Sequence, residues 1–182
     1  MKLRYENYQF PFMGGEKAKL LREGEELFRR MGIDKGKTVV DFGSGPGAFT
    51  IPIARLLGEN GKIYAVDKNE SYLRDLEEMA KNEGLKNIEI VKVGEEVALP
   101  FPSACVDIFL LFDVLHHINW DLLFPEVKRV LKPDGKVCVY PHHHLSKETL
   151  PEALGKYGLV LKEIIEGAIF IFKFSKKFTC NI

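Results

Sequence analysis

The chain has 182 residues, of which 46% are apolar and 29% charged, and its 26 basic side chains balance its 26 acidic ones. A chain of this length buries one core, so we expect residues 1–182 to form a single domain. A net charge of zero removes the general attraction to phosphate backbones and anionic lipids, which argues against nucleic acid as a partner. The sequence has neither an apolar run that would span a bilayer nor an apolar signal core, and it predicts a cytoplasmic protein with no membrane partner.

Helical and β-rich patterns alternate along most of the chain. Apolar residues recur every three or four positions from Gly15 to Met31, which is typical of an amphipathic helix. A β-rich run then ends at Phe42, a glycine-dense loop follows, and residues 49–57 have the length and composition of a helix. Further β-rich runs cover residues 62–67, 87–93, 106–111 and 136–140. Further helices are predicted at residues 71–82, 121–131 and 146–157, and a turn at residues 132–135.

This alternation predicts an α/β fold. Strands separated by helices of about a dozen residues pair in parallel through right-handed crossovers, with helices on both faces of the sheet. The end of the chain differs, because the β-rich runs at 159–165 and 168–175 are separated only by Glu166 and Gly167. A two-residue connection forces an antiparallel hairpin. We therefore expect a mainly parallel sheet of seven strands whose last pair is antiparallel.

The most informative segment is the loop that follows the first β-rich run. Asp41 is followed by glycines at alternate positions, Gly43, Gly45 and Gly47, and then by a helix. Glycine permits a sharp turn and lets a ligand approach the backbone, while the start of the helix offers unpaired N–H groups to an anion. The segment is consistent with a nucleotide-binding loop or with a tight turn that binds nothing.

A second acid, Asp67, ends the next β-rich run. In nucleotide-binding sheets, a carboxylate at this place accepts hydrogen bonds from the hydroxyls of a ribose. Alternatively, it serves as the N-terminal acid of the helix that follows. The succession of acid, glycine loop, helix, strand and second acid favours nucleotide binding.

In this succession the chain resembles the class I S-adenosylmethionine-dependent methyltransferases. Residues 41–47 are similar to the family's acid-x-Gly-x-Gly-x-Gly loop, and Asp67 is similar to its ribose-binding acid. Three later segments resemble motifs of the branch that methylates small molecules, and they cover residues 94–102, 115–118 and 129–135. The resemblance extends over nearly the whole chain. It implies a Rossmann-like α/β fold with seven strands in the order 3-2-1-4-5-7-6, of which the seventh is antiparallel.

The resemblance also implies S-adenosylmethionine as the cofactor, S-adenosylhomocysteine as the product and methyl transfer as the reaction. It places the cofactor-binding residues on the positions that match the family's motifs. These positions are Asp41, Gly43, Ser44, Gly45, Gly47, Asp67, Lys68, Glu95, Glu96 and Phe112. Glu95 departs from the pattern, because the family usually has Asp near the adenine amino group. The longer side chain would need a shifted backbone to make the same bond.

Three other functions stay open. Gly43-x-Gly45-x-x-Ala48 also satisfies the loose dinucleotide fingerprint of NAD-dependent oxidoreductases, although Gly47 directly after Pro46 fits the methyl-donor loop better. The acceptor could be RNA or protein instead of a small molecule. A non-catalytic module that binds S-adenosylmethionine would keep the same loop.

All five histidines follow the fourth and fifth predicted strands, where ligands lie in such sheets. Imidazole acts as a base near neutral pH. We therefore predict that His116 or Asp113 is the base for an acceptor that must lose a proton. The alternative is that His116 and His117 serve packing and helix capping.

His142, His143 and His144 are consecutive imidazoles of the kind that bind Zn²⁺. In an extended segment, successive side chains point to opposite sides, so only His142 and His144 would share a site. The sequence places no cysteine or acid beside them at ligand spacing. We therefore predict no metal site.

Little of the chain is left to build a pocket for the methyl acceptor. The sheet and its helices leave residues 1–16 and the loops near Leu115 and His142. We expect residues 1–16 to form a lid over the cofactor, or else to pack against the first helix, and we expect the acceptor to be a small molecule. A homo-oligomer in which a second subunit completes the pocket stays open.

Overall fold

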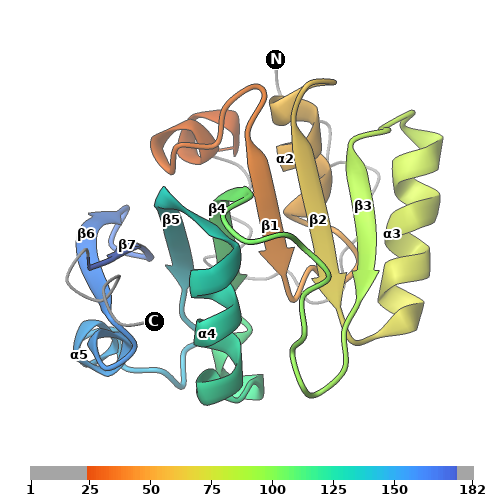
Figure 1. Ribbon diagram of the computed structural model, residues 1–182. Helices are drawn as coiled ribbons and strands as arrows, with labels where there is room; N and C mark the ends of the chain where they lie inside the picture. The colour runs from red at the N-terminus through yellow and green to blue at the C-terminus, as the bar shows by residue number, and fades with distance from the viewer. Residues whose placement is uncertain (1–23, 176–182) are drawn as a thin grey trace.

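The computed structural model describes residues 24–175 of the chain (Figure 1). Residues 24–30 are helical, which confirms the second half of the first predicted helix. The rest of that helix and the predicted lid at residues 1–16 lie outside the described residues. Within the described range, no helix is both long enough and apolar enough to cross a membrane.

Seven strands form one sheet in the order β3-β2-β1-β4-β5-β7-β6. They are β1 (Thr38–Phe42), β2 (Lys62–Asp67), β3 (Ile88–Lys92), β4 (Val106–Phe112), β5 (Leu131–Tyr140), β6 (Leu159–Ile165) and β7 (Ile169–Phe174). β1 to β5 pair in parallel, and β7 runs antiparallel to both β5 and β6. Figure 1 shows β3 toward one end of the sheet and the β6–β7 hairpin at the other. The predicted fold class and strand order are confirmed.

The hairpin turns at the two predicted residues. Glu166 and Gly167 have φ values of 51° and 63°, and the N–H of Ala168 donates to the carbonyl of Ile165 at 3.1 Å. Two successive positive φ values are the signature of the tight turn whose twist matches that of antiparallel strands. The antiparallel pairing of β6 with β7 follows from this local geometry.

Helices connect the strands. They are α2 (Thr50–Leu57), α3 (Glu70–Asn82), the 3-10 turn η1 (Leu115–His117), α4 (Trp120–Val130) and α5 (Leu150–Gly155). The helix predicted at residues 146–157 is wrong in its extent, because α5 is only six residues long. Pro151 stands in its first turn, where the missing N–H of proline is tolerated, whereas proline in the interior of a longer helix would break a hydrogen bond.

The turn predicted at residues 132–135 is not a separate element, because it lies inside β5. The pairing of β4 with β5 jumps from Val106–Leu131 to Ile108–Lys136. Residues 132–135 therefore bulge between two paired positions, as the proline at 133 requires, since it has no N–H for the ladder.

Both faces of the sheet are buried under helices. In β1, Val40 belongs to a core cluster that includes Val127 of α4, and its neighbour Val39 belongs to a cluster that includes Ile53 of α2. All four side chains are fully buried. Burial of both faces fits the continuous apolar run of the central strands. The strands are thus fixed from both sides, and the loops that follow them start from rigid positions.

Candidate functional site

The carboxyl ends of β1, β2 and β4 meet at one edge of the sheet. β1 lies between the other two, and Phe42 pairs with Val66 of β2 on one side and with Leu111 of β4 on the other. The loop that begins at Gly43, the end of β2 at Asp67 and the loop after β4 therefore lie side by side. Ligands of open α/β sheets bind beyond this edge.

A cavity of about 450 Å³ opens here, a volume within the range of small-molecule sites. Half of the predicted site residues border it, namely Gly43, Gly45, Asp67, Lys68, Glu95 and Asp113. The other half are not among its lining residues, namely Asp41, Ser44, Gly47, Glu96, Phe112 and His116. The structure thus brings six of the predicted residues together around one cavity, and the ligand site itself stays a prediction.

Two glycines of the loop have different roles, because one borders the cavity and the other packs against α3. Gly45 borders the cavity with φ at +53°, and a Cβ added there would meet no described atom within 4 Å. Gly47 has φ at +95°, and a Cβ there would stand 2.3 Å from Cδ1 of Leu76 on α3. Gly45 thus leaves backbone open toward the cavity, while Gly47 allows the loop to pack closely against α3.

Asp67 holds the glycine loop with its carboxylate. Its Oδ2 accepts a hydrogen bond from the N–H of Gly45 at 2.8 Å, and its Oδ1 accepts one from the N–H of Asn69 at 2.9 Å. Each carboxylate oxygen has further lone pairs, so both remain able to accept from a ligand. The N-cap of α3 is Asn69, and the acid in the first turn of this helix is Glu70. Asp67 contacts the start of α3 through the N–H of Asn69.

Asp41 lies under the loop and only 2% of its surface is exposed. Its Oδ2 accepts a hydrogen bond from Oγ1 of Thr50 at 2.6 Å. Burial raises the pKa of Asp41 to about 6, the hydrogen bond from Thr50 opposes this shift, and the charge of Asp67 adds to it. Asp41 therefore joins the end of β1 to the start of α2.

The segment after β3 forms the rim of the cavity. Glu95 borders the cavity and pairs with Nζ of Lys68 at 3.2 Å. Both side chains are more than half exposed, so the pair contributes little to stability. Glu96 is also exposed and lies beside the cavity. The departure from the family pattern at Glu95 thus occurs at an exposed position, where solvent leaves room for the longer side chain.

Phe112 faces away from the cavity lining. Its ring meets the ring of Phe49 edge to face at a centroid distance of 4.9 Å, and the side chain is buried. It packs in the cluster on the α2 face of the sheet. The resemblance predicted Phe112 beside the cofactor, but Phe112 is not among the residues that line the cavity.

The sequence did not single out three polar residues that border the cavity, Asn69, Tyr72 and Asn119. Asn69 and Asn119 occupy the N-cap positions of α3 and α4. Asparagine before a helical pattern is a recognised N-cap signal, which could have placed both near the strand ends. Tyr72 is one turn further into α3 and carried no such signal.

The two predicted bases differ in position. Asp113 borders the cavity and has φ at +58°, a conformation that Asp tolerates better than most residues. His116 lies in η1 beside the cavity, and Nδ1 of its ring is buried without a hydrogen-bond partner among the described residues. Burial lowers the pKa of His116, and the imidazoles of His117 and His142 lower it further.

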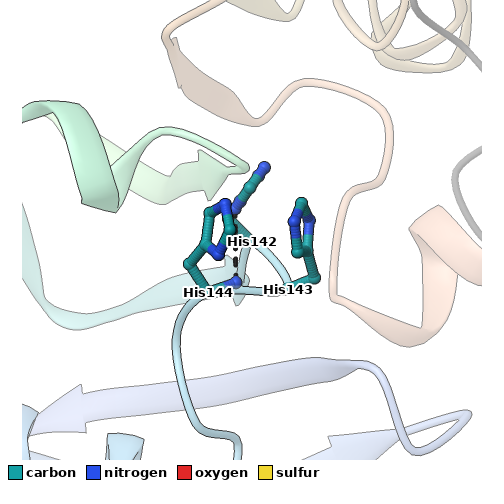
Figure 2. A group of neighbouring side chains, drawn as sticks. All are labelled: His142, His143 and His144. Carbon is teal, nitrogen blue, oxygen red and sulfur yellow. Dashed lines mark hydrogen bonds between the residues drawn. The ribbon is translucent and has the colours of Figure 1, made fainter.

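The three consecutive histidines gather on one side, as Figure 2 shows. The segment is not extended: it turns, because the N–H of Leu145 donates to the carbonyl of His142 at 2.8 Å. One ligand atom from each of His142, His143 and His144 lies within 4.8 Å of the others. The prediction that His143 would point away is therefore wrong, since it assumed an extended backbone.

The chain is similar to several known proteins. A family model described as a methyltransferase domain matches residues 33–178. The ubiquinone/menaquinone biosynthesis C-methyltransferase UbiE of Escherichia coli is 36% identical over 129 residues, which are 70% of this chain and 51% of that protein. The chain thus spans about half the length of the curated relatives it matches.

Two solved structures have the same fold. A SAM-dependent methyltransferase from Aquifex aeolicus has a TM-score of 0.72 at 26% identity, with 81% of this chain and 86% of that chain covered. A SAM-dependent O-methyltransferase from Thermotoga maritima has a TM-score of 0.65 at 19% identity, with 85% and 65% covered.

Because the family model covers most of the chain, the protein belongs to the class I S-adenosylmethionine-dependent methyltransferases. This confirms the family predicted from the loop at residues 41–47, from Asp67 and from the later motifs taken together. S-adenosylmethionine, the predicted cofactor, is the one that defines this family.

Proposed function

We propose that this chain binds S-adenosylmethionine in the 450 Å³ cavity and transfers its methyl group to a small-molecule acceptor. The observation that carries the proposal is the hydrogen bond from Gly45 to Asp67 at the cavity wall. It joins an open glycine backbone to a carboxylate that faces the same space. These are the two groups that a nucleoside with an amino acid tail requires.

In this proposal, Asp67 accepts hydrogen bonds from the ribose hydroxyls. The backbone at Gly43 and Gly45 lies against the amino acid part of the cofactor, where a side chain would collide. Lys68 and Glu95 lie at the adenine end. Asp41, Ser44 and Gly47 support the loop from behind, so their effect on binding is indirect.

The reaction is an in-line displacement. An electron pair of the acceptor forms a bond to the methyl carbon while the carbon–sulfur bond breaks. The electrons of the broken bond neutralise the sulfonium to give the thioether S-adenosylhomocysteine. The main work of the protein is to align the acceptor and to exclude water, an effect worth several kcal/mol. Where the acceptor must lose a proton, Asp113 and His116 stay the predicted bases.

A small acceptor is supported by the name of the UbiE relative, which is a C-methyltransferase of quinone biosynthesis. It is also supported by the cavity, whose lining includes Val93, Val97 and Ile118 beside its polar groups. RNA and protein acceptors, and a module that binds the cofactor without turnover, stay as alternatives. The single domain over residues 1–182, the lid at residues 1–16, a homo-oligomer and a cytoplasmic location stay predictions as well.

The experiment is isothermal titration calorimetry of the purified chain with S-adenosylmethionine, S-adenosylhomocysteine and NAD. Saturable binding of the first two at about 1 to 100 μM, equivalent to roughly 5.5 to 8 kcal/mol, without binding of NAD, supports the proposal. Small-molecule extracts incubated with cofactor that carries an isotopically labelled methyl group then identify the acceptor by mass spectrometry. Label recovered only in RNA or protein would contradict the acceptor class, and label recovered nowhere would favour a binding module.

A further inference from the structure

Two imidazoles and one carboxylate, which the proposed function does not use to bind the cofactor, form a cluster at the edge of the cavity. It combines Asp113 after β4, His116 in η1 and His142 after β5. One ligand atom from each lies within 4.8 Å of the others. Nε2 of His142 is 3.8 Å from Oδ1 of Asp113, and the rings of His116 and His142 stack at a centroid distance of 4.0 Å.

Two imidazoles and one carboxylate are a recurrent ligand set for Zn²⁺ and Fe²⁺ in proteins. Nitrogen and oxygen ligands about 2.0 to 2.2 Å from such an ion lie closer together than 4.8 Å, so small rotations of the side chains would complete the site. All three residues are partly buried, so an ion bound between them would be partly shielded from bulk water.

A second observation points the same way. Nδ1 of His116 is buried and has no hydrogen-bond partner among the described residues. Buried polar atoms are nearly always satisfied, and an exception calls for an unseen water or ion.

We propose that Asp113, His116 and His142 bind a divalent transition metal ion at the acceptor side of the cavity. This revises the prediction of no metal site, which assumed an extended segment after β5 and no acid nearby. The acid is Asp113, which directly follows β4 and lies 29 positions before His142 in the sequence. The two residues are close in space because β4 pairs with β5 up to Phe112 and Tyr140.

His142 also makes a contact that metal binding would change. The N–H of His144 donates to Nδ1 of His142 at 3.3 Å (Figure 2), which requires a lone pair on Nδ1. A metal at Nε2 shifts the ring proton to Nδ1, so this long hydrogen bond is lost. The turn that contains His143 and His144 is therefore expected to move when the metal binds, while the ligand set itself stays.

The proposal rests on the geometry of the cluster and does not depend on methyl transfer. It also bears on the predicted base, because an Asp113 or His116 lone pair held by a metal is not available for a proton. A divalent ion held by Asp113, His116 and His142 would instead supply Lewis-acid chemistry, which lowers the pKa of an oxygen, nitrogen or sulfur atom bound to it.

The experiment uses the full chain without an affinity tag that contains histidine. The protein is treated with a chelator, desalted and titrated with Zn²⁺ by calorimetry, and with Co²⁺ by visible absorption, which reports the coordination geometry. The variants are Asp113→Asn, His116→Gln and His142→Gln, and the matched control is His143→Gln, an exposed neighbour outside the ligand set. Thermal unfolding of each variant without metal verifies that it folds.

We expect one equivalent of Zn²⁺ in the wild type, and an affinity about tenfold or more lower in each of the three ligand variants. The control is expected to bind as the wild type does, and Zn²⁺ is expected to raise the Tm of both. The absence of Zn²⁺ and Co²⁺ binding by the folded wild type would overturn the proposal. Loss of binding in His143→Gln but not in Asp113→Asn would do the same, since it would assign the ion to the exposed histidine turn. If His116→Gln does not fold, Asp113→Asn and His142→Gln decide alone.

Discussion

The N–H of Gly45 donates a hydrogen bond to Oδ2 of Asp67 at 2.8 Å, and this bond joins the loop after β1 to the end of β2. Two motifs that lie in separate parts of the sequence thus form one unit at the cavity wall. Because the same carboxylate also accepts from the N–H of Asn69, Asp67 holds both the glycine loop and the start of α3. A change at Asp67 therefore affects the shape of the site as well as its contacts with a ligand.

We predict that Asp67→Ala weakens the binding of S-adenosylmethionine about 100-fold or more. The reason is the loss of charged acceptors for two ribose hydroxyls, each hydrogen bond to a charged group being worth about 1.5 to 3 kcal/mol. Asp67→Asn keeps an oxygen for the N–H of Gly45 and is expected to lose less. Calorimetry measures both, with Asp75→Ala as a control, since Asp75 is exposed on α3. Equal affinity of the wild type and Asp67→Ala would contradict the ribose role.

The burial of Asp41 is expected to make the stability of the folded chain depend on pH. Burial raises its pKa in the folded chain to about 6, above the ordinary value of about 4. The folded state therefore binds a proton more tightly than the unfolded state between these values. It follows that the contribution of Asp41 to the free energy of unfolding decreases as the pH rises from about 4 to about 6, by on the order of 3 kcal/mol for two pKa units.

The variant Asp41→Asn tests this dependence, because its amide oxygen can still accept from Thr50 while the charge is absent. Urea unfolding at about pH 4 and about pH 7 is expected to show a smaller decrease in stability for Asp41→Asn than for the wild type. Asp75→Asn, at an exposed position, is the control and should behave as the wild type does. The same decrease in wild type and Asp41→Asn would show that Asp41 does not cause it.

The sheet could be predicted because its signals are local. The alternation of β-rich runs with helices and the Glu166–Gly167 turn each act over a few residues, and burial of both faces makes the central strands continuously apolar. The extent of α5 was mispredicted, since one proline within an otherwise helical pattern decided where the helix begins.

Site residues could be predicted from the sequence only where the position demands a particular residue type. Gly45 and Asp67 stand out because a loop against a ligand needs glycine and a strand end needs an acceptor. The proximity of Asp113 to His142 depends on the pairing of β4 with β5 and on the turn after His142, and neither is encoded in the spacing of the residues. The resemblance predicts Phe112 beside the cofactor. The side of the sheet on which its side chain packs depends on the tertiary structure, and it packs in the cluster on the α2 face.

Gly47 offers a test of packing between the loop and α3. Gly47→Ala places a Cβ 2.3 Å from Leu76 at a φ of +95°. We expect the free energy of unfolding to fall by about 2 to 4 kcal/mol, from backbone strain and overpacking together. Gly84→Ala is the matched control, since its φ is +68° and no described atom lies within 4 Å of the added Cβ. Urea unfolding that shows equal losses in the two variants would mean that Leu76 gives way without cost.

Arg129 on α4 fixes the segment after β3 through hydrogen bonds to its backbone. Its guanidinium donates to the carbonyls of Phe101 at 2.7 Å and Leu99 at 2.9 Å, and Glu126, which pairs with it, accepts from the N–H of Leu99 at 2.9 Å. We expect Arg129→Ala to lower the free energy of unfolding by about 1 to 3 kcal/mol, because it leaves two carbonyls and a carboxylate without their partner. Arg129→Lys should recover only part of this loss, since an ammonium cannot span both carbonyls as the planar fork does. Hydrogen exchange at Leu99 should be faster in both variants, and unchanged exchange there would show that Glu126 alone holds the segment.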